Sequence, residues 1–179
     1  MIKIQTTLRG VYLYEYQPNV DSRGSSMAVD LNFIQVEIQT SFERWYTSCS
    51  EFGVVRGMHL AKPNREQYKL ISCFAGRIHD VLVDLRNDSE TYLQTLSLDL
   101  VGGDGKVLVV PPGVAHGFQA LEKTSIVSYL ISDSYSPEDE IALDAFSHEL
   151  GIKWPLEATY VSQRDNSGIS LVEFAREFS

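Results

Sequence analysis

The sequence predicts an all-β fold, a sandwich or barrel built from short strands. Turn signals rich in glycine, proline and aspartate recur at short intervals along the 179 residues, and runs with strand composition lie between them. We expect strands at Val11–Tyr16, Val54–Leu60, Gln67–Phe74, Ile78–Leu85, Thr91–Leu98, Lys106–Val110 and Ser125–Ile131. No repeat, low-complexity tract or linker interrupts this pattern, so we expect one domain over residues 1–179.

Alternation along three of these runs assigns side chains to faces, because successive side chains of a strand point to opposite sides of the sheet. The groups expected to share a face are Val55, Gly57 and His59; Ile78, Asp80 and Leu82; and Val127, Tyr129 and Ile131. His59, Asp80 and Tyr129 are therefore expected to line a pocket among apolar or small neighbours.

The C-terminal residues follow a helical pattern instead. Ser170 and Glu173 have the spacing of a capping box, and Leu171 and Phe174 recur at helical spacing. These features predict a short amphipathic helix that packs on the sandwich. A second, brief helix is expected to begin at Ser136-Pro137, because proline is favoured in a first helical turn.

Charge and hydropathy argue against several classes of protein. A formal net charge of −9 argues against binding to nucleic acid or to an anionic membrane. No apolar run has membrane-spanning length and the first residues lack the apolar core of a signal peptide, so we expect a cytoplasmic protein. Cys49 and Cys73 are expected to be free thiols in that compartment, with a disulfide as the alternative.

Two histidine motifs raise the question of a metal site. Gly53–His59 and Pro111–His116 match G-x5-H and P-x-G-x2-H, the motifs with which cupin proteins hold a metal between strands. Ala61 stands where a second histidine of that set is expected, and Lys69 stands where a glutamate is expected. Two histidines and a lysine together make a poor cage for a divalent cation, but they suit proton transfer. We therefore expect a metal-free, cupin-type jelly roll with an acid–base pocket and no cofactor.

His59, His116 and Asp80 are the first candidates for that pocket. An unperturbed imidazole titrates near neutrality, and His59 lies three residues after Arg56 within its motif. The alternative for His59 is a core histidine bonded to a backbone carbonyl. Asp80 lies in an apolar strand and needs a partner if it is buried, for which His116 is the natural candidate. The alternative for His116 is a structural role in closing the Pro-Pro-Gly turn.

Three further residues would not be singled out alone. Lys69 could extend its ammonium group to solvent, Tyr129 could simply pack, and Asp165 could be a solvated loop acid. His79 and His148 are expected to be structural or surface residues.

A series of short motifs keeps its order and spacing from about residue 10 to residue 165. They are Asp21–Gly24, Val55–His59, Lys69-Leu70, Gly76–Val81, Val83–Arg86, Pro112–Phe118, Tyr135–Pro137, Leu150–Pro155 and Ser162–Asp165. Each is weak by itself, but the ordered set resembles the dTDP-4-dehydrorhamnose 3,5-epimerase family. The resemblance implies a jelly-roll homodimer that epimerises a nucleotide-linked 4-keto-6-deoxy sugar without a metal or redox cofactor.

The resemblance also implies roles for individual residues. His59 matches the catalytic base, Asp165 the acid that orients and polarises it, and Tyr129 the proton donor on the opposite face of the sugar. Lys69 matches the residue near the keto oxygen of the substrate. The positions that match substrate contacts are Arg23, Arg56, His116, Glu140 and Arg164, with Arg164 in place of the usual lysine. Asp80 is expected to support His116.

Three segments depart from the family pattern. Ser25–Ala28 replaces aromatic residues and a glutamate, Arg44–Ser48 replaces a Gln-x-Asn-x-Ser run, and Tyr135 follows Ser134 where a Tyr-Tyr pair is common. These positions belong to the nucleotide-binding side of the pocket. We therefore hypothesise a sugar nucleotide with a different base or sugar, or an enzyme that inverts one carbon only. A ketoisomerase and a non-catalytic sugar-binding protein stay open as alternatives.

Overall fold

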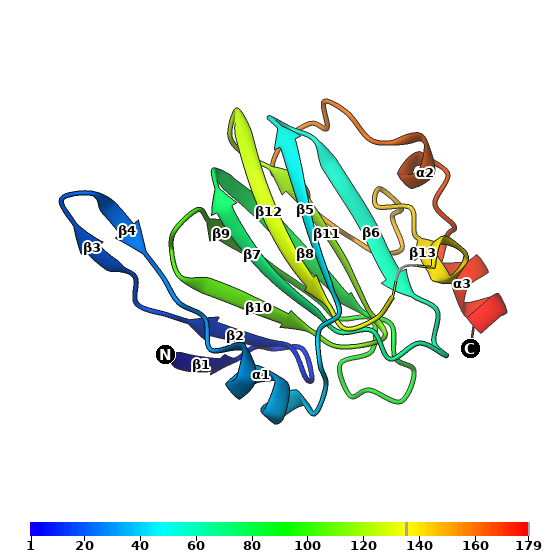
Figure 1. Ribbon diagram of the computed structural model, residues 1–179. Coiled ribbons are helices and arrows are strands. Elements are labelled where there is room, and N and C mark those ends of the chain that lie inside the picture. Colours follow the sequence, from blue (N-terminus) through cyan, green and yellow to red (C-terminus); the bar gives the residue numbers. More distant parts are fainter. Residues whose placement is uncertain (135, 179) are drawn as a thin grey trace.

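Two antiparallel sheets face each other and form the body of the molecule (Figure 1). The computed structural model describes residues 1–134 and 136–178. The first sheet has six strands in the order β1 (Ile2–Gln5), β2 (Tyr12–Glu15), β10 (Lys106–Val110), β7 (Lys69–Ala75), β12 (Thr124–Ile131) and β5 (Arg44–Glu51). The second has five, in the order β13 (Glu140–Ala142), β6 (Val55–Ala61), β11 (Val114–Ala120), β8 (Arg77–Asp84) and β9 (Thr95–Val101).

Smaller elements surround the two sheets. They are the hairpin of β3 (Asn19–Asp21) and β4 (Gly24–Ser26), helices α1 (Leu31–Ile38), α2 (Gln163–Asn166) and α3 (Leu171–Phe178), and a 3-10 turn at Pro137–Asp139. The hairpin projects away from the body, whereas α2 and α3 lie beside the second sheet (Figure 1). The predicted all-β jelly roll with short peripheral helices is confirmed, and it is a sandwich of two separate sheets.

All of the predicted strands are present, but some real strands were missed. The run predicted from Thr91 becomes a strand only at Thr95. Strand β5 escaped prediction because most of its residues are exposed, as expected for the edge of a sheet. Strand β11 escaped because every one of its residues is buried, so it shows no alternation. Helix α1 was also missed.

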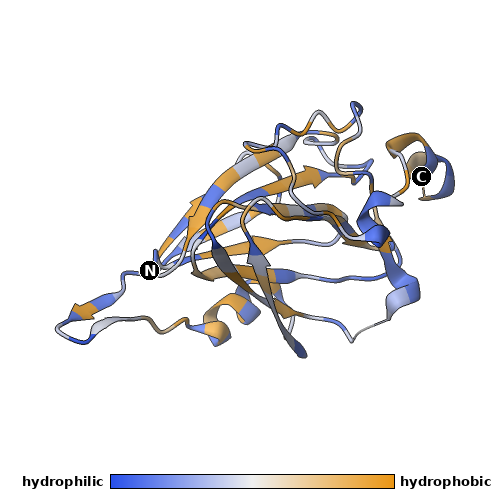
Figure 2. Cartoon of the chain, turned by 90° about the horizontal axis from the view of Figure 1, so that it is seen from above, coloured by the Kyte–Doolittle hydropathy of each residue, from blue (hydrophilic) through white to orange (hydrophobic). Residues whose placement is uncertain are grey.

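Three apolar clusters hold these layers together. The main cluster fills the space between the sheets and contains Ile71, Ile78, Leu82, Leu108 and Phe118 among its fully buried side chains. A second cluster lies between the second sheet and the C-terminal segment, and a third lies between the first sheet and α1. Apolar and polar residues alternate along several strands, while the loops are more hydrophilic (Figure 2). Each large side chain buried in this way contributes about 1.5–3 kcal/mol.

The C-terminal helix has the predicted cap. The Ser170 hydroxyl accepts a hydrogen bond from the Glu173 amide at 3.2 Å, and the Ser170 amide donates to the Glu173 carboxylate at 2.8 Å. Phe174 is buried in the second cluster, and its ring lies 5.3 Å from that of Phe178. The capping box therefore sets where α3 begins, and its apolar face fixes the C-terminal segment to the second sheet.

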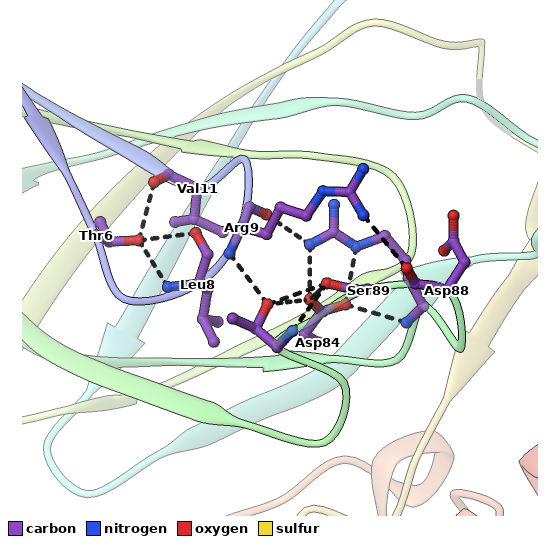
Figure 3. Close-up of polar contacts among 9 residues, drawn as sticks. Thr6, Leu8, Arg9, Val11, Asp84, Asp88 and Ser89 are labelled. Carbon is purple, nitrogen blue, oxygen red and sulfur yellow. Dashed lines mark hydrogen bonds and ion pairs between the residues drawn. The ribbon is translucent and has the colours of Figure 1, made fainter.

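A buried carboxylate ties the N-terminal segment to the end of β8 (Figure 3). Asp84 is fully buried and accepts hydrogen bonds from the Arg86 guanidinium at 2.7 and 2.8 Å. The hydroxyls of Ser89 and Thr91 each donate to it at 2.6 Å. Thr91 in turn accepts the Arg9 amide at 3.1 Å. Burial acts to raise the pKa of Asp84, but these donors outweigh it and lower the pKa to about 2.

Replacing Asp84 with asparagine should destabilise the protein in a pH-dependent way. The folded pKa of about 2 lies below the ordinary 3.8, so this stabilisation is full above the ordinary pKa and is lost as pH falls toward 2. Asp84→Asn should lower the free energy of unfolding by about 2 kcal/mol at neutral pH, and by much less near pH 2. Urea unfolding at both pH values measures this difference.

The matched control is Asp99→Asn, which removes a partly exposed carboxylate paired with Arg77 and His79. It should cost less than about 1 kcal/mol at neutral pH. Equal stability of the parent and Asp84→Asn at neutral pH would contradict the role given to the buried network.

Candidate active site

A cavity of about 590 Å³ opens between the two sheets. Side chains from both sheets and from the C-terminal segment line it: Arg44, Tyr46, Arg56, His59, Lys69, His116, Phe118, Tyr129, Ile131, Glu140, Ser162, Arg164 and Asp165. Eight residues of the predicted site are in this set. The jelly roll therefore brings side chains that are far apart in the sequence together around a single cavity.

A bulge in β6 turns two of these residues inward. His59 is opposite His116 on β11, but Arg56 is opposite Phe118, so β6 has one residue more than β11 over this stretch. The extra residue places both Arg56 and His59 in the cavity. The expectation that Val55 shares a face with His59 was wrong, because Val55 packs in the cluster beneath the C-terminal segment. Simple alternation cannot anticipate a bulge.

Gly57 makes this bulge possible. Its φ is +117°, a conformation that residues with a side chain rarely adopt. A Cβ atom at this position would lie 2.6 Å from the Cα of Gly117 and 2.8 Å from the carbonyl oxygen of His116. The backbones of β6 and β11 therefore approach too closely for any other residue.

His59 and Asp165 form a hydrogen-bonded pair. The His59 Nε2 lies 2.7 Å from Oδ1 of Asp165, while the second carboxylate oxygen accepts the Gly57 amide at 3.2 Å. Asp165 is buried in α2, whose first turn is capped by the hydroxyl of Ser162 at 3.1 Å. Burial acts to raise the pKa of Asp165, but the bonds from His59, Gly57 and Ser162 hold it below its usual value. The carboxylate is thus ionised and fixes the orientation of the imidazole.

Tyr129 reaches the same cavity from the other sheet. Its ring lies between Tyr46, at a centroid distance of 5.5 Å, and His116, at 5.9 Å. Burial raises the pKa of Tyr129 well above its usual value, and the charge of Asp80 raises it further. The phenol therefore keeps its proton at ordinary pH, which suits a proton donor rather than a base.

His116 has the predicted partner. Its Nε2 lies 2.7 Å from Oδ2 of Asp80, which is fully buried. The pairing accounts for a carboxylate in an apolar strand and holds the imidazole in one orientation. Ile78 and Leu82 lie in the core between the sheets, as the alternation of β8 predicts.

Lys69 is a cation beside the His59 strand. Its ammonium group donates to the His59 carbonyl oxygen at 3.4 Å. Burial lowers the pKa of Lys69 to about 8; the charge of Glu140 opposes the shift, and those of Arg44 and Arg164 add to it. The group stays largely charged at neutral pH.

Arg56 bonds only to neutral acceptors among the described residues. Its guanidinium donates to the Ser50 hydroxyl at 2.8 Å and to the Cys49 carbonyl at 3.3 Å. Within residues 1–134 and 136–178, neither Arg56 nor Lys69 forms an ion pair with a carboxylate. Two positive charges in the cavity are therefore available to an anionic ligand.

Comparison with known proteins decides the family. Residues 5–173 match the family described as dTDP-4-dehydrorhamnose 3,5-epimerase. The chain belongs to this family. It is 32% identical to the dTDP-4-dehydrorhamnose 3,5-epimerase of Methanothermobacter thermautotrophicus over 169 residues, which cover 92% of this chain and 91% of the relative.

Two further relatives are informative. The dTDP-4-dehydrorhamnose 3-epimerase of Streptomyces niveus is 31% identical over 165 residues, with 92% of this chain and 74% of the relative covered. The crystal structure of dTDP-6-deoxy-D-glucose-3,5-epimerase from Legionella pneumophila, in complex with dTDP-4-keto-L-rhamnose, gives a TM-score of 0.91 at 30% identity. That match covers 99% of this chain and 96% of the other.

One predicted site residue lies away from the cavity, and one residue of the family pattern is not described. Arg23 is in the turn of the β3–β4 hairpin; its side chain is 88% exposed, pairs with Asp21 and does not line the cavity. Tyr135, quoted for the resemblance, lies outside the described residues.

Several cavity residues of this family member were not among the predicted site residues: Arg44, Tyr46, Phe118, Ile131 and Ser162. Arg44 and Tyr46 lie on β5 opposite Ile131 and Tyr129, so they point to the same side of the first sheet. One feature of the sequence could have pointed to Arg44 and Tyr46, since both lie in a segment that departs from the family pattern.

No group of three histidine, cysteine, aspartate or glutamate side chains among the described residues could hold a metal ion. The absence of a metal and of a cofactor stays a prediction. Cys49 and Cys73 are free thiols, as expected. No helix in the described part of the chain is long and apolar enough to cross a membrane.

The close approach at Gly57 gives a test of the site's architecture. Gly57→Ala should lower the free energy of unfolding by about 2–4 kcal/mol, because it adds a steric clash to an unfavourable φ. Gly24→Ala is the matched control, since Gly24 has a φ of +122° and nothing lies within 4 Å of the position that a Cβ atom would take there. The control should cost about 1 kcal/mol. Chemical unfolding compares the two, and equal losses would mean that the contact with β11 is unimportant.

Proposed function

We propose that the protein epimerises a nucleotide-linked 4-keto-6-deoxy sugar, as dTDP-4-dehydrorhamnose 3,5-epimerases do. One observation carries this proposal: an imidazole paired with a carboxylate and a protonated phenol enter one cavity from opposite sheets. Such an arrangement allows a proton to leave one face of a sugar carbon and another to arrive at the opposite face. Membership of the epimerase family supports it.

The chemistry needs an acidic C–H bond and a place for negative charge. Carbons next to the C4 ketone are acidified by it, so His59 can remove a proton while Asp165 holds the ring in place. The charge then moves to the carbonyl oxygen, where the Lys69 ammonium stabilises the enolate. Tyr129 delivers a proton from the other side and inverts the centre. Each positioned acid or base contributes about 10²–10⁴-fold.

The charges of the cavity suit a sugar nucleotide. Its cationic side chains, apart from the histidines, are Arg44, Arg56, Lys69 and Arg164, and its carboxylates are Glu140 and Asp165. The excess of positive charge matches a diphosphate, and Arg56 and His116 are the residues we assign to ligand contact. The net charge of −9 for the whole chain still argues against nucleic acid as a partner.

A single-centre epimerase is the second candidate, because the Streptomyces niveus relative is named a 3-epimerase. The same base and acid could serve one carbon or two in turn. The two candidates differ in which hydrogens of the sugar exchange with solvent.

Isotope exchange tests the proposal. In D₂O, the protein should place deuterium at C3 and C5 of a dTDP-4-keto-6-deoxyhexose, or at C3 alone if it is a 3-epimerase. His59→Asn should slow exchange about 10²–10⁴-fold. Tyr129→Phe should retain exchange, because His59 can return a deuteron to its own face, but should lose inversion. NMR of substrate and product measures both.

His79→Asn is the control, since His79 pairs with Asp99 outside the cavity. Its exchange rate should match the parent. Absence of exchange in the parent with dTDP- and other nucleotide-linked 4-keto sugars would refute the proposed function, as would full exchange in His59→Asn.

A second copy of the chain is the partner we propose. A groove of about 320 Å³ on the outer face of the first sheet is mostly apolar. Trp45 and Phe74 are 69% and 53% exposed there, which is unusual for large apolar side chains. The β3–β4 hairpin projects away from the body (Figure 1), and Arg23 in its turn does not line the cavity, so we place a ligand contact by Arg23 in the cavity of another copy. The single domain and the cytoplasmic location stay predictions.

Mixed dimers test whether Arg23 acts on a second copy. Arg23→Met and His59→Asn should each be poorly active alone. After equal mixing and subunit exchange, about half of the dimers should be heterodimers, and one of the two cavities in each heterodimer should have both an intact Arg23 and an intact His59. The mixture should therefore recover about a quarter of the parent's activity. Absence of recovery, despite heterodimers seen by native mass spectrometry, would show that Arg23 does not serve a second copy's cavity.

A further inference from the structure

The Tyr129 ring packs against a fixed neighbour from the second sheet. The His116 ring meets it edge-on, with a centroid distance of 5.9 Å and 71° between the ring planes. His116 is itself only 4% exposed and lies 2.7 Å from a carboxylate oxygen of the fully buried Asp80. Closely packed groups that are also hydrogen-bonded have little freedom to move. His116 therefore gives Tyr129 a rigid surface to rest on.

A second ring contacts Tyr129 from the edge of the first sheet. Tyr46 on β5 is directly opposite Tyr129 on β12, and the two ring centroids are 5.5 Å apart with 41° between the planes. This distance lies in the range at which aromatic pairs attract each other. Tyr46 is 50% exposed, whereas Tyr129 is 8% exposed. Tyr46 is thus part of what separates the phenol from solvent.

No other residue on this face of β5 could replace the Tyr46 ring. The inward positions of the strand are Arg44, Tyr46, Ser48 and Ser50, and Ser50 already accepts the Arg56 guanidinium at 2.8 Å. Strand β5 is also the last strand of its sheet, so within the described residues no further strand covers Tyr46 from that side. The contact therefore depends on a single side chain.

We propose that Tyr46 is a positioning residue for the proton donor. Its ring holds the Tyr129 phenol against His116 and away from solvent, which aims the phenol at the carbon that has lost its proton. This inference rests on the proposed function. Tyr46 lines the cavity, so the same ring is also available to a bound ligand.

The positioning should appear in the fate of the enolate rather than in its formation. His59 forms the enolate, and it can return a deuteron to the face that the proton left, which gives exchange without inversion. Tyr129 can instead transfer its proton to the opposite face, which gives inversion and leaves a phenolate. Misplacing a reacting group by about 1 Å lowers a rate by about 10²-fold. Loss of the Tyr46 ring should therefore slow inversion and spare exchange.

Isotope exchange in D₂O separates positioning from ligand binding. In Tyr46→Ala, the ratio of inverted product to incorporated deuterium should fall about tenfold or more, while total exchange stays within about threefold of the parent. Both processes start from the same bound substrate, so a loss of affinity alone leaves their ratio unchanged. Tyr46→Phe keeps the ring and should restore the parent's ratio. Tyr46→Leu, which keeps apolar bulk without a ring, should give an intermediate ratio.

The matched control is Tyr160→Ala. Tyr160 is 65% exposed and does not line the cavity, so the variant removes a tyrosine ring elsewhere on the surface. Its ratio of inversion to exchange should equal that of the parent.

A second measurement does not depend on activity. Burial raises the pKa of Tyr129, Asp80 on β8 and Tyr46 raise it further, and Arg56 on β6 lowers it; His116 on β11 is the other titratable group in contact. Removing the Tyr46 ring exposes the phenol, so its pKa should fall toward the ordinary 10.0. In NMR of ¹³Cζ-tyrosine protein, assigned with Tyr129→Phe, the Tyr129 signal should titrate below about pH 11 in Tyr46→Ala only.

An unchanged ratio of inversion to exchange in Tyr46→Ala would overturn the positioning role. An equal loss in Tyr46→Phe would do the same, because the hydroxyl and not the ring would then be responsible. If the parent shows no isotope exchange, the proposed function fails, yet the NMR titration still tests whether Tyr46 shields Tyr129. A Tyr129 signal that does not titrate below about pH 11 in Tyr46→Ala would refute the shielding.

Discussion

The close contact between two backbones at Gly57 and Gly117 is the constraint on which the site depends. Because β6 and β11 touch there without side chains between them, β6 can accommodate one extra residue and still pair on both sides of it. Arg56 and His59 consequently face the same space, although their spacing would send them to opposite faces of a regular strand. The same bulge presents the Gly57 amide to Asp165. One backbone irregularity thus determines where His59, Asp165 and Arg56 lie relative to one another.

The surroundings of Asp165 and Tyr129 differ in a way that suits the roles proposed for them, an orienting carboxylate and a proton donor. Asp165 is buried but receives several donors, so its pKa is lowered and it stays ionised beside His59. Tyr129 is buried near the carboxylate of Asp80, so its pKa is raised and it stays protonated. Burial and local hydrogen bonding thus keep one group charged and the other neutral, as the proposed function requires.

Much of the fold and part of the site follow from the sequence. Regular strands such as β8 and β12 show clear alternation, so the inward positions of Asp80 and Tyr129 were predictable. The order of the motifs indicated that His59, Tyr129 and Asp165 belong together, although His59 and Asp165 are separated by 106 residues. What escaped prediction has a physical cause in each case. The bulge at Gly57 interrupts alternation, the edge strand β5 has too few apolar residues, and α2 is too short to show periodicity. Arg23 lies in the exposed turn of the β3–β4 hairpin and does not line the cavity of its own chain.

Alternate side chains of strand β12 face two different environments. Tyr129 and Ile131 face the cavity, whereas Ser128 and Leu130 line the outer groove, where the Ser128 hydroxyl accepts the Trp45 indole N–H at 2.6 Å. Strand β5 is divided in the same way, with Arg44 and Tyr46 inward and Trp45 outward. A shift of either strand to suit a neighbour on the outside would also move the cavity side chains Tyr129 and Tyr46 on the inside. The outer groove and the inner cavity therefore share two strands, so that a change of geometry on one side is transmitted to the other.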